Sequence, residues 1–320
     1  MTHDLASYYG PAAGIATSIL WTATSIAFTA AGRRIGATLV NSLRIFMATV
    51  LLGITHRLIF KTWIPQAESQ QFLYLAVSGL LGLSLGDQAL FIAYVDIGPR
   101  LAMLIMALSP ILAAMFGWVA MGEALGRWGL VGIVLTIGGI AWVVLERPAA
   151  VRTAASSHRV RGLVLAFIAA GCQAGGLYLS KKGMGYGGLP DAQHVHPLAA
   201  AFVRMAIASL GMLPILTIRQ LIARRRRTSD APAARPGNLR KGLLLTVCGS
   251  LVGPYLGMWM SLEATARAPL GVAQSLMSLP PILILPFAVL VYKEAIGGRA
   301  ILGAILAVGG ATLLFFFTPH

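Results

Sequence analysis

The sequence contains few charged residues and few cysteines. Asp, Glu, Lys and Arg make up only 11% of the 320 residues, whereas 57% of the residues are hydrophobic. A water-soluble domain needs more polar residues to cover its surface, so the composition indicates an integral membrane protein. The two cysteines, Cys172 and Cys248, lie in apolar segments and form no CxxC pattern. The sequence therefore predicts neither a disulfide framework nor a redox or zinc motif of that type.

Sequence motifs typical of catalysis are also missing. There is no GxSxG, no HExxH and no Walker loop, and the histidines lie at the ends of apolar segments, in connections or at the termini. His194 and His196 form an HxH without evident further ligands, so we predict no metal site. We expect neither an enzyme nor a cofactor, and any transport must be driven by a gradient or by exchange.

Apolar runs of about 20 residues, each long enough to cross a hydrocarbon core of about 30 Å, recur along the whole chain. We read the first run as a span rather than a signal peptide, because it lacks a basic leader. The predicted fold class is an all-α integral membrane protein with ten transmembrane helices, at Ala12–Ala31, Thr38–Ile59, Phe72–Val95, Leu101–Met121, Trp128–Leu145, Leu163–Leu179, Pro197–Ile218, Gly242–Leu262, Leu270–Tyr292 and Ala300–Phe317.

Basic residues are distributed unevenly over the connections between these spans. The net charge is +15, but the Lys and Arg residues lie in short connections rather than on one folded face, so we expect no nucleic-acid partner. The odd-numbered connections hold 17 of them and the even-numbered connections hold 6. By the positive-inside rule, this bias predicts a multi-pass protein of the plasma (inner) membrane with both termini on the non-cytoplasmic side.

The two halves of the chain carry the same pattern of prolines, glycines and charged residues. Arg44 has its counterpart in Arg204 at an offset of 160, because the second half carries an extra loop, "GYGGLPDAQHVH". Further along, the offset is 171 and pairs Pro110 with Pro281. The same offset pairs small residues spaced by four, which predict a close helix-packing seam in each half: Ser78, Gly82 and Gly86 with Gly249, Gly253 and Gly257.

Each half contains five predicted spans, and an odd number reverses the orientation of the second copy in the membrane. We therefore predict two inverted five-helix repeats around a central cavity. Many secondary transporters have this arrangement, because two halves that exchange conformations expose one site to either side in turn.

The duplicated pattern resembles the EamA-type transporters of the drug/metabolite transporter superfamily. The resemblance rests on "LSPILAAMFGWVAMGEAL" and "LPPILILPFAVLVYKEAI", each followed by a Gly-rich span, and it covers nearly the whole chain. It implies two EamA-like repeats, 12–146 and 161–318, around a central cavity. It also implies transport of small metabolites, amino acids or drugs, often as export. The family's usual cytoplasmic termini disagree with the charge count.

Asp87 is the acidic residue that lies deepest within a predicted span. A charged residue within the membrane costs about 2.5 to 3.5 kcal/mol on insertion scales, so its presence indicates a functional or structural role. Asp87 either binds a proton, a cationic substrate or both, or it caps a loosened helix turn or bonds to a neighbouring residue without a role in transport. Gln88 points to a different face of the same helix, whereas Tyr94 lies seven residues on and shares the face of Asp87.

Two arginines lie about two turns inside their spans. Arg44 and Arg204 could attract a carboxylate or phosphate, but their presence in both copies favours side chains that snorkel to the membrane interface. Asn41, one turn before Arg44, aligns with an alanine and is the better candidate for specificity.

The remaining candidates fall into three groups. Glu123 and Glu294 end their spans near arginines and are interpreted as interfacial structural residues. Prolines predict helix breaks beside the transport pathway at Pro110, Pro280, Pro281 and Pro286. Polar and aromatic residues that could line the cavity, although packing explains the aromatic ones equally well, are Gln173, Tyr178, Tyr255, Trp259, Gln274 and Ser275.

Together these patterns predict a secondary transporter of small organic metabolites that works by alternating access. The proposed driving force is a proton gradient or exchange, and the family resemblance implies export. A passive channel or facilitator for small solutes is the alternative, and flux that saturates and counter-exchanges would separate the two. The expected partners are a small-molecule substrate and membrane lipids, and both a monomer and a homodimer remain open.

Overall fold

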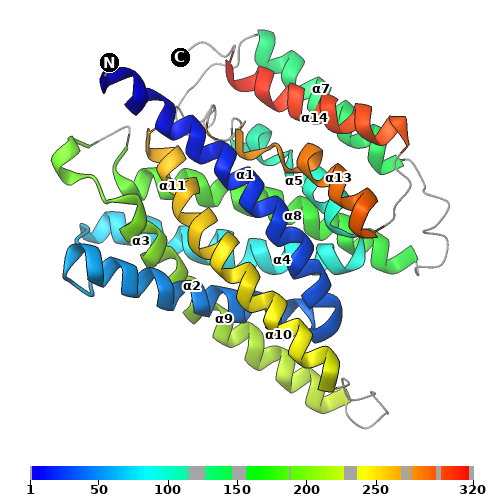
Figure 1. Ribbon diagram of the computed structural model, residues 1–320, viewed down its shortest axis with the longest axis horizontal. Helices are drawn as coiled ribbons and strands as arrows, with labels where there is room; N and C mark the ends of the chain where they lie inside the picture. The colour runs from blue at the N-terminus through cyan, green and yellow to red at the C-terminus, as the bar shows by residue number, and fades with distance from the viewer. Residues whose placement is uncertain are drawn as a thin grey trace.

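The computed structural model describes residues 2–113, 115, 127–145, 156–186, 189–226, 236–267, 273, 276–292 and 297–316. Every regular element within these residues is helical. The helices pack into one bundle (Figure 1), and the start of α1 and the end of α14 lie toward the same end of it.

The described helices are distributed over both halves of the chain. The first half contains α1 (Thr2–Ile35), α2 (Ala37–Phe60), α3 (Ser69–Ser78), the π-helical segment η1 (Gly79–Gly86), α4 (Asp87–Asp96), α5 (Pro99–Met106) and α7 (Arg127–Leu145). The second half contains α8 (Ser156–Met184), the short 3₁₀ turn η3 (Asp191–Gln193), α9 (Pro197–Arg226), α10 (Pro236–Ser250), the π-helical segment η4 (Leu251–Gly257), α11 (Met258–Arg267), α13 (Pro280–Tyr292) and α14 (Gly298–Phe316).

Six helical stretches within the described residues are long and apolar enough to cross a membrane. They are Ala12–Ile35, Ala37–Phe60, Ser69–Asp96, His158–Met184, Pro197–Ile218 and Leu239–Arg267, and shorter apolar helices occur at Pro99–Ala113, Val131–Trp142 and Ile301–Gly310. Several helices are longer than the sequence predicted, because α1 begins at Thr2, α8 begins at Ser156 and α9 ends at Arg226. Hydropathy marks only the apolar part of a helix, whereas its backbone hydrogen bonds continue into the polar flanks.

Two helices restart at prolines in equivalent positions of the two halves. α5 is followed by a turn at residues 107–108, and the chain becomes helical again at Ser109, directly before Pro110. In the second half a turn residue and one residue without regular structure precede α13, which begins at Pro280. Proline fits the first turn of a helix, where its missing N–H is not needed. The break predicted at Pro286 is wrong, because α13 continues through it to Tyr292.

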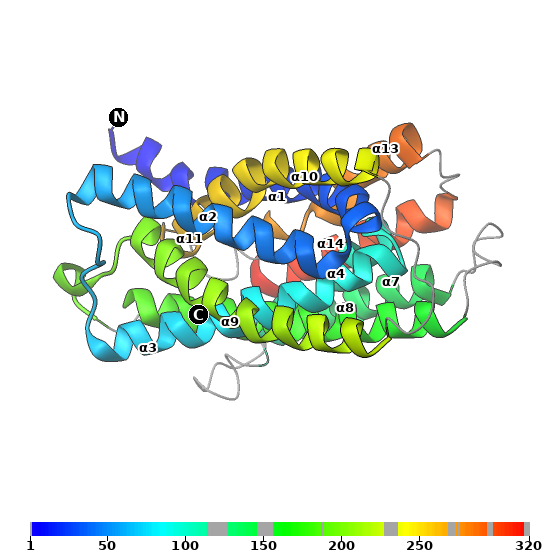
Figure 2. The ribbon, with the colours of Figure 1, turned by 90° about the horizontal axis from the view of Figure 1, so that it is seen from below.

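Glycines form the predicted packing seams of the third and eighth spans. On η1, an alanine Cβ at Gly86 would lie 2.7 Å from the Cβ of Cys172 on α8. On η4, the same change at Gly253 would bring a Cβ within 2.8 Å of Thr24 on α1. The seams therefore allow η1 to pack closely on α8 and η4 to pack closely on α1. Figure 2 shows α2 and α10 along one side of the bundle and α8 along the other.

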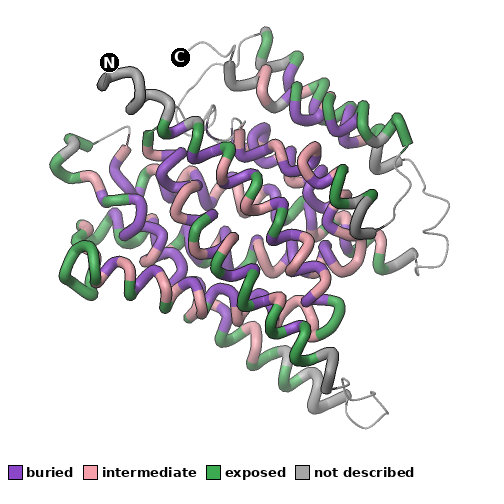
Figure 3. Tube along the Cα trace, in the orientation of Figure 1, coloured by how far each residue is buried: buried purple, intermediate pink, exposed green. Residues whose placement is uncertain are grey.

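The outer faces of the bundle are apolar. Figure 3 shows that exposed residues follow the outer sides of the helices, while buried residues concentrate between them. Exposed apolar side chains include Phe46 on α2, Val134 on α7 and Leu210 on α9. Hydroxyl groups are buried instead, and many donate to a backbone carbonyl four residues earlier, as Thr17 does to Ala13. An apolar exterior over a partly polar interior suits a lipid environment.

Candidate functional site

A cavity of about 110 Å³ lies between helices of both halves. Its wall includes Trp21 and Phe28 of α1, Arg44 of α2, and Asp87 and Tyr94 of α4. The second half contributes Gln173 of α8, Gly253 and Pro254 of η4, Met258 of α11, Pro280 and Pro281 of α13, and also Met277 and Ser278. The cavity therefore combines a mainly apolar and aromatic wall with a few polar groups, which is the usual composition of a small-molecule site.

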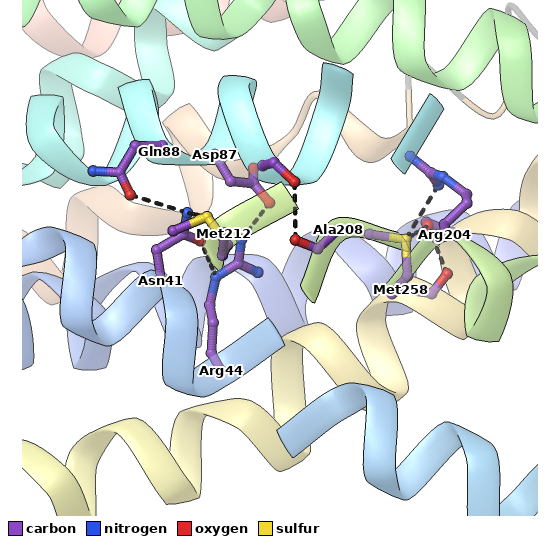
Figure 4. A network of polar contacts seen from close by, with 10 residues as sticks. Asn41, Arg44, Asp87, Gln88, Arg204, Ala208, Met212 and Met258 are labelled. Atoms are coloured by element: carbon purple, nitrogen blue, oxygen red, sulfur yellow. Dashed lines mark hydrogen bonds and ion pairs between the residues drawn. The ribbon is translucent and has the colours of Figure 1, made fainter. Parts of the chain in front are cut away.

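A buried ion pair forms the charged part of the wall. The Arg44 guanidinium donates from Nη2 to Oδ2 of Asp87, and the two side chains are 6% and 16% exposed (Figure 4). Asp87 is the first residue after η1, and its backbone N–H bonds to the carbonyl of Gly82, five residues earlier. The π-helical register thus sets where the carboxylate points, and such segments often occur at functional sites.

A chain of amides positions the arginine. Arg44 Nε donates to Oδ1 of Asn41 at 3.0 Å, and Asn41 Nδ2 donates to Oε1 of Gln88 at 3.3 Å. Gln88 Nε2 in turn donates to the hydroxyl of Thr38 at 2.9 Å. Gln88 therefore points away from the helix face of Asp87, as predicted, but it belongs to the same hydrogen-bond network through Asn41. Asn41 is fully buried and is absent from the cavity wall, so it positions Arg44 rather than contacting a ligand.

Aromatic rings surround the guanidinium. The ring centre of Phe91 lies 4.6 Å from Arg44 Cζ, within the range of a cation–π interaction. Phe28 packs on Phe91 with the ring centres 5.2 Å apart. The Tyr94 hydroxyl donates to Met103 Sδ at 3.5 Å, and Tyr94 shares the cavity with Asp87 as the sequence predicted.

Arg204 occupies the position in α9 that Arg44 occupies in α2. Its side chain is buried, with 1% exposed, and its Nη1 donates to the thioether of Met258 at 3.3 Å (Figure 4). Its Nε has no hydrogen-bond partner among the residues that the structure describes. The interpretation of Arg44 and Arg204 as snorkelling anchors is therefore wrong, because packing between helices holds both guanidinium groups inside the bundle.

Other candidates from the sequence lie away from the cavity. Tyr178 is half-buried and is not part of the wall. The Tyr255 hydroxyl bonds to Thr55 at 2.8 Å, and Trp259 donates to Oε1 of Glu263 at 3.1 Å, so both make helix contacts.

The proline-containing helices contribute to the wall as predicted. Pro280 and Pro281 line the cavity, whereas Pro110 and Pro286 do not. The candidates Glu123, Glu294, Gln274 and Ser275 lie outside the described residues.

Sequence reasoning missed the wall contributed by α1. Trp21, Thr24, Ser25 and Phe28 follow the spacing of one helical face and all line the cavity. That periodicity was the available signal in the first span. The buried carboxylate of Glu263 was also missed, and it pairs with Nε of Arg267 at 2.8 Å.

The site contains charged side chains that can bind a charged ligand and exchange ionic partners. Three ionised groups, Arg44, Asp87 and Arg204, lie in its wall or directly behind it. Ser109 also lines the cavity, and its buried hydroxyl has no hydrogen-bond partner within the described part of the chain. Among the described residues, no group of three or more His, Cys, Asp or Glu side chains could hold a metal ion.

Comparisons with known proteins agree with this architecture. A family model described as the EamA-like transporter family matches residues 9–145 and again residues 160–316. A solved crystal structure is similar over 97% of this chain and 96% of its own, with a TM-score of 0.64 and 20% identity, which shows a shared fold. No curated protein sequence matches the chain significantly.

Proposed function

The chain belongs to the EamA-like transporter family, and we propose that it is a secondary transporter that moves small organic metabolites by alternating access. The observation that carries this proposal is the buried Arg44–Asp87 pair in the wall of a cavity that both halves of the chain enclose. A charge pair inside an apolar bundle is costly and typically marks a pathway for a substrate or ion.

The proposed arrangement is ten transmembrane helices in two inverted five-helix repeats. Equivalent contacts in the two halves support it. The third-span segments α3, η1 and α4 pack on α8, and the eighth-span segments α10, η4 and α11 pack on α1. The two pairs α2 with α9 and α7 with α14 also pack together, as elements related by a pseudo-twofold axis would.

Alternating access in this arrangement follows from the two π-helical segments and the two proline restarts. Each half has a π-helical segment beside the cavity, η1 before Asp87 and η4 before Met258. The backbone hydrogen bonds change register in such segments, which often occur at functional sites. Opening on one side and closing on the other would exchange the conformations of the two halves around one fixed cavity.

Proton coupling through Asp87 is part of the proposal. A proton on Asp87 neutralises the carboxylate that pairs with Arg44. The substrate, or a contact made in the opposite conformation, then compensates the guanidinium. Export is the proposed direction, as the family resemblance implies. The proposed location is the plasma (inner) membrane, with both termini on the non-cytoplasmic side, because the odd-numbered connections carry most of the Lys and Arg residues.

The test is flux in proteoliposomes. Labelled amino acids, organic acids and cationic drugs are supplied with and without an imposed proton gradient, for wild type, Asp87→Asn and the control Thr217→Ala on the exposed side of α9. We expect saturable flux that the gradient raises and that Asp87→Asn loses. Wild-type rates and an unchanged pH dependence in Asp87→Asn would contradict proton coupling through Asp87. Flux that neither saturates nor counter-exchanges would instead establish a passive channel.

A further inference from the structure

Arg204 is a buried cation that forms no ion pair of its own within the described part of the chain. Among the described residues no carboxylate pairs with it, its Nη1 reaches only the Met258 thioether, and its Nε has no acceptor. An arginine cannot lose its proton inside a protein, and a thioether is a weak acceptor. Holding a guanidinium in a low-dielectric interior under these conditions is costly unless an anion compensates it.

The first half of the chain shows how the same position is neutralised. Arg44 corresponds to Arg204 at the offset of 160, and Asp87 corresponds to Met258 at the offset of 171. Arg44 contacts Asp87, and Arg204 contacts Met258, so the geometry of the pair is repeated while the carboxylate is replaced by a thioether. Among the described residues the two arginines have one aspartate between them, which leaves one positive charge without a paired carboxylate.

Met258 separates this charge from the cavity. It lines the cavity wall, and its sulfur lies 3.3 Å from Arg204 Nη1. Methionine has three rotatable bonds and can repack easily. Beside it, Gly82 has no side chain, and a Cβ there would lie 3.4 Å from Arg204 Nη2. A ligand that moves the Met258 side chain aside therefore reaches the unpaired face of the guanidinium.

We propose that the cavity takes a monoanionic organic acid whose carboxylate displaces the Met258 thioether and pairs with Arg204. This inference rests on the proposed transport function and names its substrate class. One monovalent anion brings the sum of Arg44, Asp87 and Arg204 to zero. The aromatic rings of Trp21 and Phe28 accommodate the apolar body of the acid.

A second unpartnered donor supports an oxygen-rich ligand. The Ser109 hydroxyl lines the cavity, is buried and has no hydrogen-bond partner among the described residues. A carboxylate can accept a hydrogen bond from it. A zwitterionic amino acid is disfavoured, because its ammonium group would enter a site that already carries excess positive charge.

The experiment compares ligands that differ in charge and variants that differ in charge. The ligands are butyrate, hexanoate and phenylacetate with their neutral amides, together with phenethylamine and phenylalanine. Binding is measured as thermal stabilisation of the purified full chain in detergent, which does not require transport. The variants are Met258→Asp, which supplies an internal carboxylate, and Met258→Asn, which has nearly the same shape without the charge.

We expect at least one carboxylate to bind the wild type about tenfold or more tightly than its amide, since charge-assisted hydrogen bonds are roughly twice as strong as neutral ones. Met258→Asp should unfold at a higher temperature than Met258→Asn and should lose the preference for carboxylates, while Met258→Asn keeps it. The proposal is overturned if no carboxylate is preferred over its amide in the wild type, or if Met258→Asp keeps the preference.

Flux assays with the same ligands separate this inference from the proposed function. Binding of carboxylates without saturable flux would support the anion site and contradict the proposed transport function. Flux of cations or neutral solutes, without a preference for carboxylates, would support transport and contradict the anion site.

Discussion

Two equivalent arginines, one in each half of the chain, have different surroundings. Arg44 has a carboxylate, an amide and an aromatic face as partners, through Asp87, Asn41 and Phe91. Arg204 has one thioether and an unpaired Nε. The residues that correspond to Asp87 and Asn41 in the second half are Met258 and Ala201. Both halves of the chain therefore carry the arginine, but among the described residues only the first half pairs it with a carboxylate.

Backbone packing, by contrast, is nearly the same in both halves. Gly139 of α7 and Gly310 of α14 face each other's helix backbones, so that an added Cβ would lie 2.6 Å from the carbonyl oxygens of Gly303 and Gly132 respectively. The comparison separates two kinds of constraint. Small residues preserve how the helices approach one another, whereas the polar groups between the helices differ and can give the cavity its chemistry.

The largest expected effect comes from removing the carboxylate of the first half. Asp87→Leu leaves Arg44 buried and unpaired, so we expect the free energy of unfolding to fall by about 3 to 5 kcal/mol. Thermal or denaturant unfolding of the purified protein in detergent measures it. The double variant Arg44→Met with Asp87→Leu should recover most of this loss, because an apolar pair can replace a buried ion pair. A double variant as unstable as Asp87→Leu would show that the charge pair is not the cause.

Removing the amide beside Arg44 should have the next largest effect. Asn41→Ala deletes the acceptor of Arg44 Nε and imitates the second half, where Ala201 stands. We expect a loss of about 1.5 to 3 kcal/mol, the range for hydrogen bonds to charged groups. The same unfolding assay checks it, and the control is Ser42→Ala, which removes only a hydroxyl bonded to its own helix. Equal losses in the two variants would mean that Asn41 does not position Arg44.

The shared packing predicts equal effects in the two halves. Gly139→Ala and Gly310→Ala should each destabilise the protein by about 1 to 3 kcal/mol through backbone overlap. The neighbouring changes Gly138→Ala and Gly309→Ala meet no atom within 4 Å and should be neutral or slightly stabilising. Unfolding of the four variants in parallel tests the pseudo-symmetry of α7 and α14. A cost at only one of the two positions would argue against it.

The sequence predicted the duplicated frame better than it predicted the cavity. Glycine spacing and proline positions act through the backbone, which is why the seams of η1 and η4 and the restarts near Pro110 and Pro280 could be predicted. The shared face of Asp87 and Tyr94 followed from the helical period.

The wall of α1 was not predicted, because a Ser or Thr hydroxyl within a span commonly bonds to the backbone of its own helix and then does not show which side faces the cavity. Thr24 and Ser25 both bond in this way. The pairing of Arg44 with Asp87 depends on how α2 and α4 pack, and their distance along the chain contains no such information. The snorkelling interpretation was wrong for the same reason: depth in a span does not show whether a side chain faces lipid or a neighbouring helix.

The smallest expected effect concerns the extra loop of the second half, which has no counterpart in the first. His196 ends this loop, and its ring lies edge-on to Phe60 with the ring centres 5.2 Å apart. Burial lowers the pKa of His196 below its usual 6.5, with Arg267 and His56 acting in the same direction and Glu263 opposing them. The folded state therefore disfavours the charged ring. The stability that His196 contributes is present above pH 6.5 and falls as the pH drops from there toward the lower pKa of the folded state.

His196→Gln should remove this dependence, so that the difference in melting temperature between the variant and the wild type changes between pH 7.5 and pH 5. Thermal unfolding in detergent across that range measures it, with His158→Gln at the exposed start of α8 as the control. A wild type and His196→Gln that lose stability in parallel on acidification would assign the pH dependence to other groups. The loop would then add no pH-dependent stability to the second half through His196.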